Sequence, residues 1–153
     1  MSGIKFDANV TGFDQLERDL AEIRKRVNNF EPVFRKMGPW WVRRQRAHFR
    51  GNRSPRMPRL AASTIAKHGN HPPLIRTGNL YRSTIDRSPV TAGPDYAVFG
   101  IPRGSNTVKV AAVHANGGPG RRVPRRDPVP GLNAAEREEL RDMIRNYVTE
   151  GLS

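Results

Sequence analysis

The sequence predicts an α+β fold in which a small antiparallel sheet packs against amphipathic N-terminal and C-terminal helices, with a long basic loop between them. Helical periodicity at both ends of the chain and short strand-like runs in between are the observations that predict it. The chain has 153 residues and no cysteine. We therefore expect one domain, residues 1–153, that is stabilised by packing or by assembly rather than by disulfides.

The N-terminal third predicts one strand and then two helices. Residues 4–10 alternate apolar and polar side chains, which is the period of a half-buried strand. Pro32 suits the first turn of a helix that runs toward Phe49, with a kink or a restart at Gly38. Before it, residues 13–27 predict an amphipathic helix whose apolar face consists of Phe13, Leu16, Leu20, Ile23 and Val27.

Trp40 and Trp41 are neighbours on the second of these helices. Adjacent helical positions point about 100° apart, so we do not expect both rings in one core. One of them is expected at an interface between subunits.

Two further helices are predicted, one inside a long loop and one at the C-terminus. Residues 50–73 are rich in Gly, Pro, Arg, Asn and His, so we expect a long, basic, partly mobile loop. Within it, residues 60–67 can form a short helix, with Ser63 as its cap. Asn133 and Glu136 have the spacing of a capping box. They precede a helix whose apolar side chains are Leu140, Met143, Ile144, Tyr147 and Val148.

The centre of the chain predicts a hairpin. Residues 83–90 and 96–101 have the composition of strands, and the turn sequence at residues 91–94 separates them. Residues 108–114 fit a strand or a short helix equally, because their apolar run is too short to show a period.

The positive charge lies in the middle of the chain. The net charge is +13, and residues 35–126 contain 19 Lys and Arg against only Asp86 and Asp95. Arginines without an intervening acid repel one another, so we favour an anionic partner over a face that is merely solvated. Arginine binds carboxylates and phosphates alike, so the partner is either an acidic protein surface or nucleic acid. The expected basic surface, which faces this partner, consists of Arg43, Arg44, Arg46, Arg50, Arg53, Arg56 and Arg59.

No arrangement of side chains predicts catalysis, a metal site or a cofactor. The four histidines are scattered, and carboxylates are rare in the basic middle. We therefore expect a protein that is not an enzyme and that holds no metal or cofactor. No apolar run approaches the roughly 20 residues of a membrane-spanning helix, and residues 1–10 lack the apolar stretch of an export signal. We expect a soluble chain that does not contact membranes.

Four short motifs follow one another through the second half of the chain. Residues 57–64 (MPRLAAST) resemble the pattern W-x-x-L-x-x-x-T, with Met57 in place of Trp, and residues 74–85 (LIRTGNLYRSTI) resemble LxxTGxLxxSI. Residues 112–118 (AVHANGG) resemble A-x-x-H-x-x-G, and residues 123–125 (VPR) resemble V-P-x-R. The R-D-P that follows departs from the usual R-P-F. In this order the motifs resemble those of the tailed-phage virion morphogenesis family, whose members act in tail completion or in the neck that joins head to tail.

This resemblance implies a structural virion protein that is assembled in the host cytoplasm. It implies a ring, expected to have six copies, at the top of the tail or in the neck, through which the DNA passes. The implied partners are further copies of the chain, neighbouring ring proteins and, without sequence preference, genomic DNA. Thr77 is expected to cap a helix, Gly78 to permit close packing, and Leu80 to enter the core. The motif residues with a structural role are then Leu60, Thr64, Leu74, Thr77, Gly78, Leu80, His114, Gly117, Pro124 and Arg125.

The composition alone supports a second hypothesis. A chain of pI about 11.4 with clustered arginines is also typical of a free basic protein that binds nucleic acid. The two hypotheses differ in whether the chain assembles without DNA.

Overall fold

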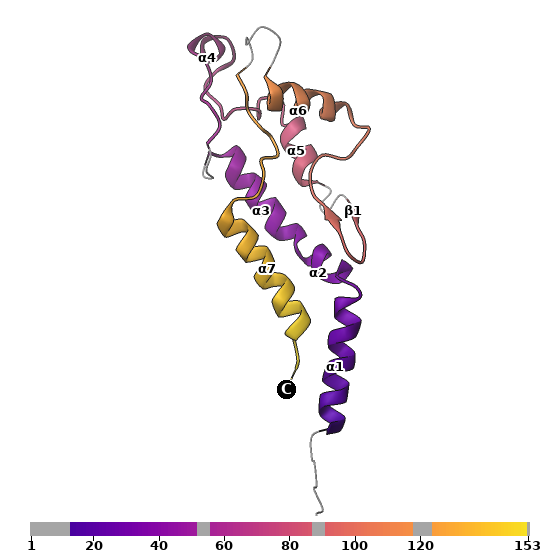
Figure 1. Ribbon diagram of the computed structural model, residues 1–153. Coiled ribbons are helices and arrows are strands. Elements are labelled where there is room, and N and C mark those ends of the chain that lie inside the picture. The colour runs from indigo at the N-terminus through magenta and orange to yellow at the C-terminus, as the bar shows by residue number, and fades with distance from the viewer. Residues whose placement is uncertain (1–12, 52–55, 87–90, 118–123, 153) are drawn as a thin grey trace, which may run out of the picture.

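The computed structural model describes residues 13–51, 56–86, 91–117 and 124–152. It confirms an α+β fold, in which helices dominate and one short antiparallel hairpin is the sheet (Figure 1). The strand predicted at residues 4–10 lies outside the described residues. In chain order the elements are α1 (Phe13–Val27), α2 (Glu31–Lys36), α3 (Gly38–Phe49), α4 (Ala62–His68), α5 (Asn79–Ile85), β1 (Thr91–Ala92), β2 (Ala97–Val98), α6 (Asn106–Asn116) and α7 (Ala134–Thr149).

The restart predicted between the second and third helices is confirmed. Pro32 and Pro39 lie in the first turns of α2 and α3, where a missing amide hydrogen costs no helical hydrogen bond. Met37 separates the two helices and is almost fully buried. Helical geometry continues across it, because its amide donates to the carbonyl groups of α2.

The core forms around α3, which packs against α5, while α5 in turn packs against α6. Leu80 of α5 is buried, as predicted. The Trp41 indole donates from Nε1 to the Thr84 carbonyl at 2.8 Å and lies against the ring of Phe99. Both Trp40 and Trp41 are buried, so the expectation that they would not share a core is wrong. The reason is that α3 has neighbours on several sides, so side chains that point about 100° apart are both covered.

A hairpin is present but it is shorter than predicted, and its first strand, β1, consists of Thr91 and Ala92, which were predicted as part of the turn. Residues 87–90 of the predicted first strand lie outside the described residues. Thr91 pairs with Val98 and Ala92 pairs with Ala97. Residues 83–85, predicted as the start of the first strand, are the last turn of α5. There the Ser83 hydroxyl donates to the Leu80 carbonyl, and the Thr84 hydroxyl donates to the Tyr81 carbonyl. Both hydroxyl groups are therefore satisfied within the helix. The hairpin contacts α2.

Two predicted helix caps are wrong. α4 begins at Ala62, so Ser63 lies inside the helix, and α4 has no side-chain cap. α5 follows Gly78, not Thr77, and this glycine has a φ of 70°. A Cβ at Gly78 would meet only the Arg82 side chain, at 3.8 Å or more. Glycine is therefore required here by the left-handed backbone and not by close packing.

The ambiguous stretch at residues 108–114 is helical, within α6. At the C-terminal helix, the capping box is confirmed. Asn133 Oδ1 accepts from the Glu136 amide at 2.8 Å, and Glu136 Oε2 accepts from the Asn133 amide at 2.9 Å. These bonds fix the start of α7 beside α3 (Figure 1).

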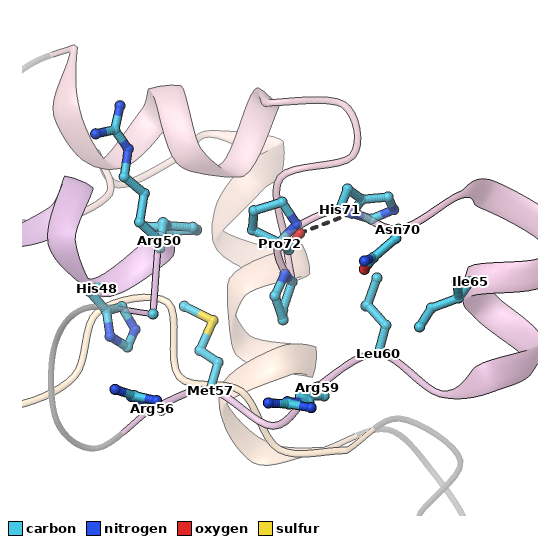
Figure 2. A pocket seen from close by; sticks show the side chains of 13 residues that line it. His48, Arg50, Arg56, Met57, Arg59, Leu60, Ile65, Asn70, His71 and Pro72 are labelled. Carbon is cyan, nitrogen blue, oxygen red and sulfur yellow. Dashed lines mark hydrogen bonds between the residues drawn. The ribbon is translucent and has the colours of Figure 1, made fainter.

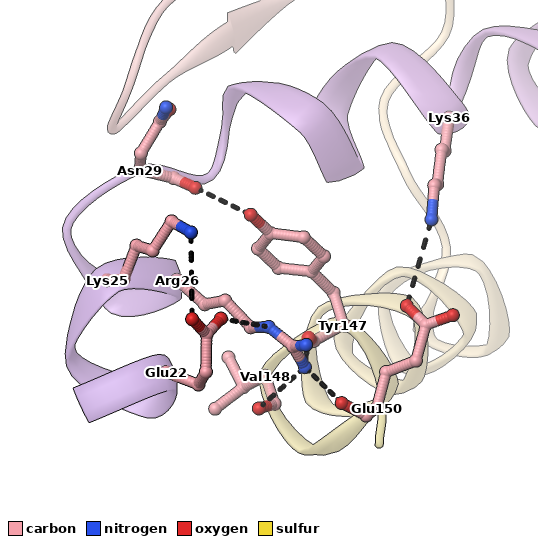
Figure 3. Close-up of polar contacts among 8 residues, drawn as sticks. All are labelled: Glu22, Lys25, Arg26, Asn29, Lys36, Tyr147, Val148 and Glu150. Atoms are coloured by element: carbon pink, nitrogen blue, oxygen red, sulfur yellow. Dashed lines mark hydrogen bonds and ion pairs between the residues drawn. The ribbon is translucent and has the colours of Figure 1, made fainter. Parts of the chain in front are cut away.

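Side chains near the two chain ends join α1 to α7 (Figure 3). Arg26 donates to the carbonyl oxygens of Tyr147, Val148 and Glu150 at the end of α7. These carbonyls carry the partial negative charge of a helix C-terminus, which a guanidinium complements. The Tyr147 hydroxyl donates to the carbonyl of Asn29, in the link between α1 and α2, at 3.1 Å. α1 is thus attached to the body near its C-terminal end.

Candidate functional site

The arginines of α3 divide between two faces of the helix. Arg43, Arg46 and Arg50 are exposed, and their spacing of three and four places them on one face. Arg44 is buried on the opposite side, next to Gln45. The predicted basic surface therefore loses Arg44, because this side chain faces the interior.

Arg44 is a structural cation. Its side chain is 3% exposed, and its Nε lies 3.2 Å from Oε1 of Glu136, whose side chain is 12% exposed. Its guanidinium also donates to the carbonyls of Pro130 and Gly131 and lies 5.0 Å from the Trp41 ring centre. A buried charge needs this number of partners, since an unpaired one would be strongly destabilising. Arg44 thus holds the start of α7 and the segment before it against α3.

His48 lies one helical turn after Arg44 and also binds the segment that leads into α7. Its Nε2 donates to the carbonyl of Asp127 at 2.7 Å. Side chains at positions i and i+4 share a helix face, so both reach the chain segment that leads into α7. Sequence reasoning missed this pair, although Trp41, Arg44 and His48 have the spacing of one buried face.

A second buried arginine, Arg126, was also missed. Its side chain donates to the carbonyls of Pro58 at 2.9 Å and Arg59 at 2.7 Å, and its amide donates to the His114 carbonyl at 2.7 Å. It therefore ties α6 to the segment that follows residues 52–55. Burial, together with the charge of Arg126, lowers the pKa of His114 below its usual value of 6.5. Burial also lowers the pKa of Arg126. The predicted neighbour, Arg125, is exposed.

The exposed arginines collect beside a hollow of about 650 Å³ at the end of α3 (Figure 2). Arg50, Arg56 and Arg59 line it. Among the described residues, no carboxylate forms an ion pair with Arg46, Arg50, Arg56 or Arg59. Arg43, in contrast, lies 3.9 Å from Glu139. Arg53 lies outside the described residues. The basic surface that the structure supports is therefore Arg46, Arg50, Arg56 and Arg59, with Arg43 at its edge.

The structure brings most of the motif residues together. A second hollow, of about 500 Å³, lies between α4, α5 and α6. Four separate segments of the chain contribute motif residues to it. The motif residues that line it are Leu60, Thr64, Leu74, Thr77, Leu80, His114 and Pro124. The other three motif residues do not line it: Gly78 is the N-cap of α5, and Gly117 and Arg125 are not part of the lining.

Within the residues that the structure describes, no group of three or more His, Cys, Asp or Glu side chains could hold a metal ion. The helices described here include none that is both long and apolar enough to cross a membrane. Comparison of the chain with protein-family models, with curated proteins and with solved structures found no match.

Proposed function

We propose that this chain is a structural protein of a tailed-phage virion, a tail-completion or neck component that forms a ring at the junction of head and tail. DNA passes through the ring, and the basic surface meets an anionic partner. The observation that carries the proposal is the separation of the arginines into two sets. Arg44 and Arg126 are buried and bind carbonyl groups, while Arg50, Arg56 and Arg59 are exposed and line one hollow.

The exposed set calls for a partner with negative charge. Several guanidinium groups at one end of α3 raise the local positive potential, and this repulsion is relieved when carboxylates or phosphates bind. In a ring, acidic surfaces of adjacent rings or the DNA in the channel supply these groups. The convergence of motif residues around the second hollow supports the same proposal, because it makes the motifs parts of one packed unit.

The same arginines favour a second candidate function, that of a free nucleic-acid-binding protein. This function requires the isolated chain to bind DNA. If each of the four exposed arginines neutralises one phosphate, log K should fall with log salt with a slope of about −3.6.

The two functions are separated by a titration of fluorescently labelled duplex DNA at several salt concentrations. The proposed function predicts that the monomer does not bind tightly at physiological salt, and that any binding follows assembly. Tight binding by the monomer, with the slope given above, would contradict it. If such binding occurs, replacing Arg50 and Arg59 by Gln should weaken it. The matched control replaces Arg141 and Arg145 of α7, which are exposed and pair with acids on their own helix.

A further inference from the structure

The apolar face of α1 is largely uncovered. α7 contacts α1 at Arg26, one turn from half-buried Ile23. The rest of that face, here named the α1 stripe, is 48–57% exposed, and Figure 1 shows α1 extending away from the body. A helix of 15 residues is marginal alone and depends on packing of its apolar face, so the stripe needs a partner. The α1 stripe consists of Phe13, Leu16, Leu20 and Val27.

The α1 stripe has the spacing of a coiled-coil seam. Together with Ile23, its residues recur in steps of three and four along residues 13–27, which is a heptad repeat. A helix with this seam packs side by side with a second helix at a small crossing angle, so that the apolar side chains interlock. A second copy of α1 carries the same seam and is therefore a matching partner.

The charges of α1 are divided along its length. All four acids lie at residues 14–22, and three of the four bases lie at residues 24–26. At 100° per residue, the charged residues nearest to the α1 stripe on the flank away from α7 are Glu17 and Arg24. Both side chains are exposed, and neither forms an ion pair with another described residue. Because acids and bases are equal in number, α1 complements its own reversed copy rather than a surface of one sign.

We propose that the α1 stripes of two copies pack against each other in antiparallel orientation, with Glu17 of each copy beside Arg24 of the other. This register sets Leu16 against Val27 and Leu20 against Ile23 of the second copy, and two-fold symmetry repeats each contact. A parallel pair would set the acidic halves of the two helices side by side. It would also leave Glu17 about 10 Å along the helix axis from Arg24 of the second copy.

This contact goes beyond the proposed function. It joins the same surface of two copies, so it closes at two and does not by itself build a ring. The free chain is then a two-fold dimer through α1, and contacts around a ring use other surfaces. The dimer and the ring can therefore be tested separately.

Charge reversal tests the register. Glu17→Lys and Arg24→Glu each turn two attractive contacts of the dimer into repulsive ones, so sedimentation over a concentration series should show dimerisation weakened about tenfold by either change. The double variant Glu17→Lys/Arg24→Glu exchanges the two signs and should dimerise as tightly as the wild-type protein. Lys25→Glu makes the same charge change on the opposite face of α1 and is the control, which should leave dimerisation unchanged.

A mixture of the two single variants tests the antiparallel orientation. In a mixed dimer, the introduced lysine faces the introduced glutamate, and the remaining Arg24 faces the remaining Glu17. The mixture should therefore dimerise more tightly than either variant alone, and an affinity tag on one variant should capture the other. All substituted side chains are exposed, so each variant should fold, which the fluorescence of the buried tryptophans reports.

The outcomes are distinct. If both single variants dimerise like the wild-type protein, or if neither the double variant nor the mixture regains dimerisation, the pairing is wrong, while a ring that wild-type protein forms would stand. If wild-type protein stays monomeric throughout the concentration series, both this inference and self-assembly of the isolated chain are contradicted.

Discussion

Replacement of Glu136 should destabilise the protein far more than replacement of any exposed acid on α7. Glu136→Ala removes the carboxylate that faces Arg44 and one of the two bonds of the capping box. Removing one partner of a buried ion pair costs about 3–5 kcal/mol, because the other charge stays buried. Arg44 keeps two carbonyl acceptors and the Trp41 ring, which places this variant at the lower end of that range.

We therefore expect Glu136→Ala to lower the free energy of unfolding by about 3 kcal/mol and the Tm by about 6–12 °C. Glu138→Ala, whose carboxylate pairs with Arg141 on the surface, is the control and should change stability by less than about 0.5 kcal/mol. Urea unfolding, followed by the fluorescence of the buried tryptophans at one fixed protein concentration, measures both.

A double-mutant cycle tests the physical reason. Glu136→Gln keeps a residue that can complete the capping box but removes the charge, and Arg44→Met removes the buried cation. The double variant should lose about 2 kcal/mol less than the two single variants together, because neither charge is then left without the other. Additive losses, or a Glu136→Ala variant as stable as the control, would refute the assignment of Arg44 as a structural cation.

Three further predictions follow from buried or strained positions. Leu80→Asp should abolish folding, because it buries a carboxylate in the core; soluble protein that assembles would contradict this placement. Gly78→Ala should cost about 1–2 kcal/mol, because φ is 70° there, whereas Gly131→Ala, at an open position without positive φ, should be nearly neutral in urea unfolding. The lowered pKa of His114 means that the unfolded chain binds protons more readily, so the stability present above pH 6.5 should decrease as the pH falls below it. His114→Gln should flatten this decrease in unfolding curves measured between pH 7.5 and 5; an unchanged pH dependence would argue against it.

Local patterns predicted the helices well. The spacing of apolar residues in α1 and α7, the prolines of α2 and α3, and the capping box at Asn133 each act within a few residues of the chain. Such signals depend little on the rest of the fold. The same is true of Leu80, whose place in α5 follows from the short motif around it.

Features set by tertiary contacts were not predictable in the same way. Ser83 lies in a helix because α5 packs on α3, although its sequence context favours a strand. The local sequence could not distinguish buried Arg44 from its exposed neighbour Arg43, since the partner of Arg44 is the carboxylate of Glu136, about 90 residues later in the chain. Arg126 is missed for the same reason: its acceptors are carbonyl groups of a distant segment.

The central claim is that copies of this chain assemble without DNA, and the mass of the purified protein tests it most directly. Multi-angle light scattering at low and high salt, with and without duplex DNA, measures that mass. We predict a closed oligomer that persists at both salt concentrations and without DNA, since apolar contacts are not screened by salt. A monomer that increases in mass only when DNA is added would contradict the account and would favour the free nucleic-acid-binding protein.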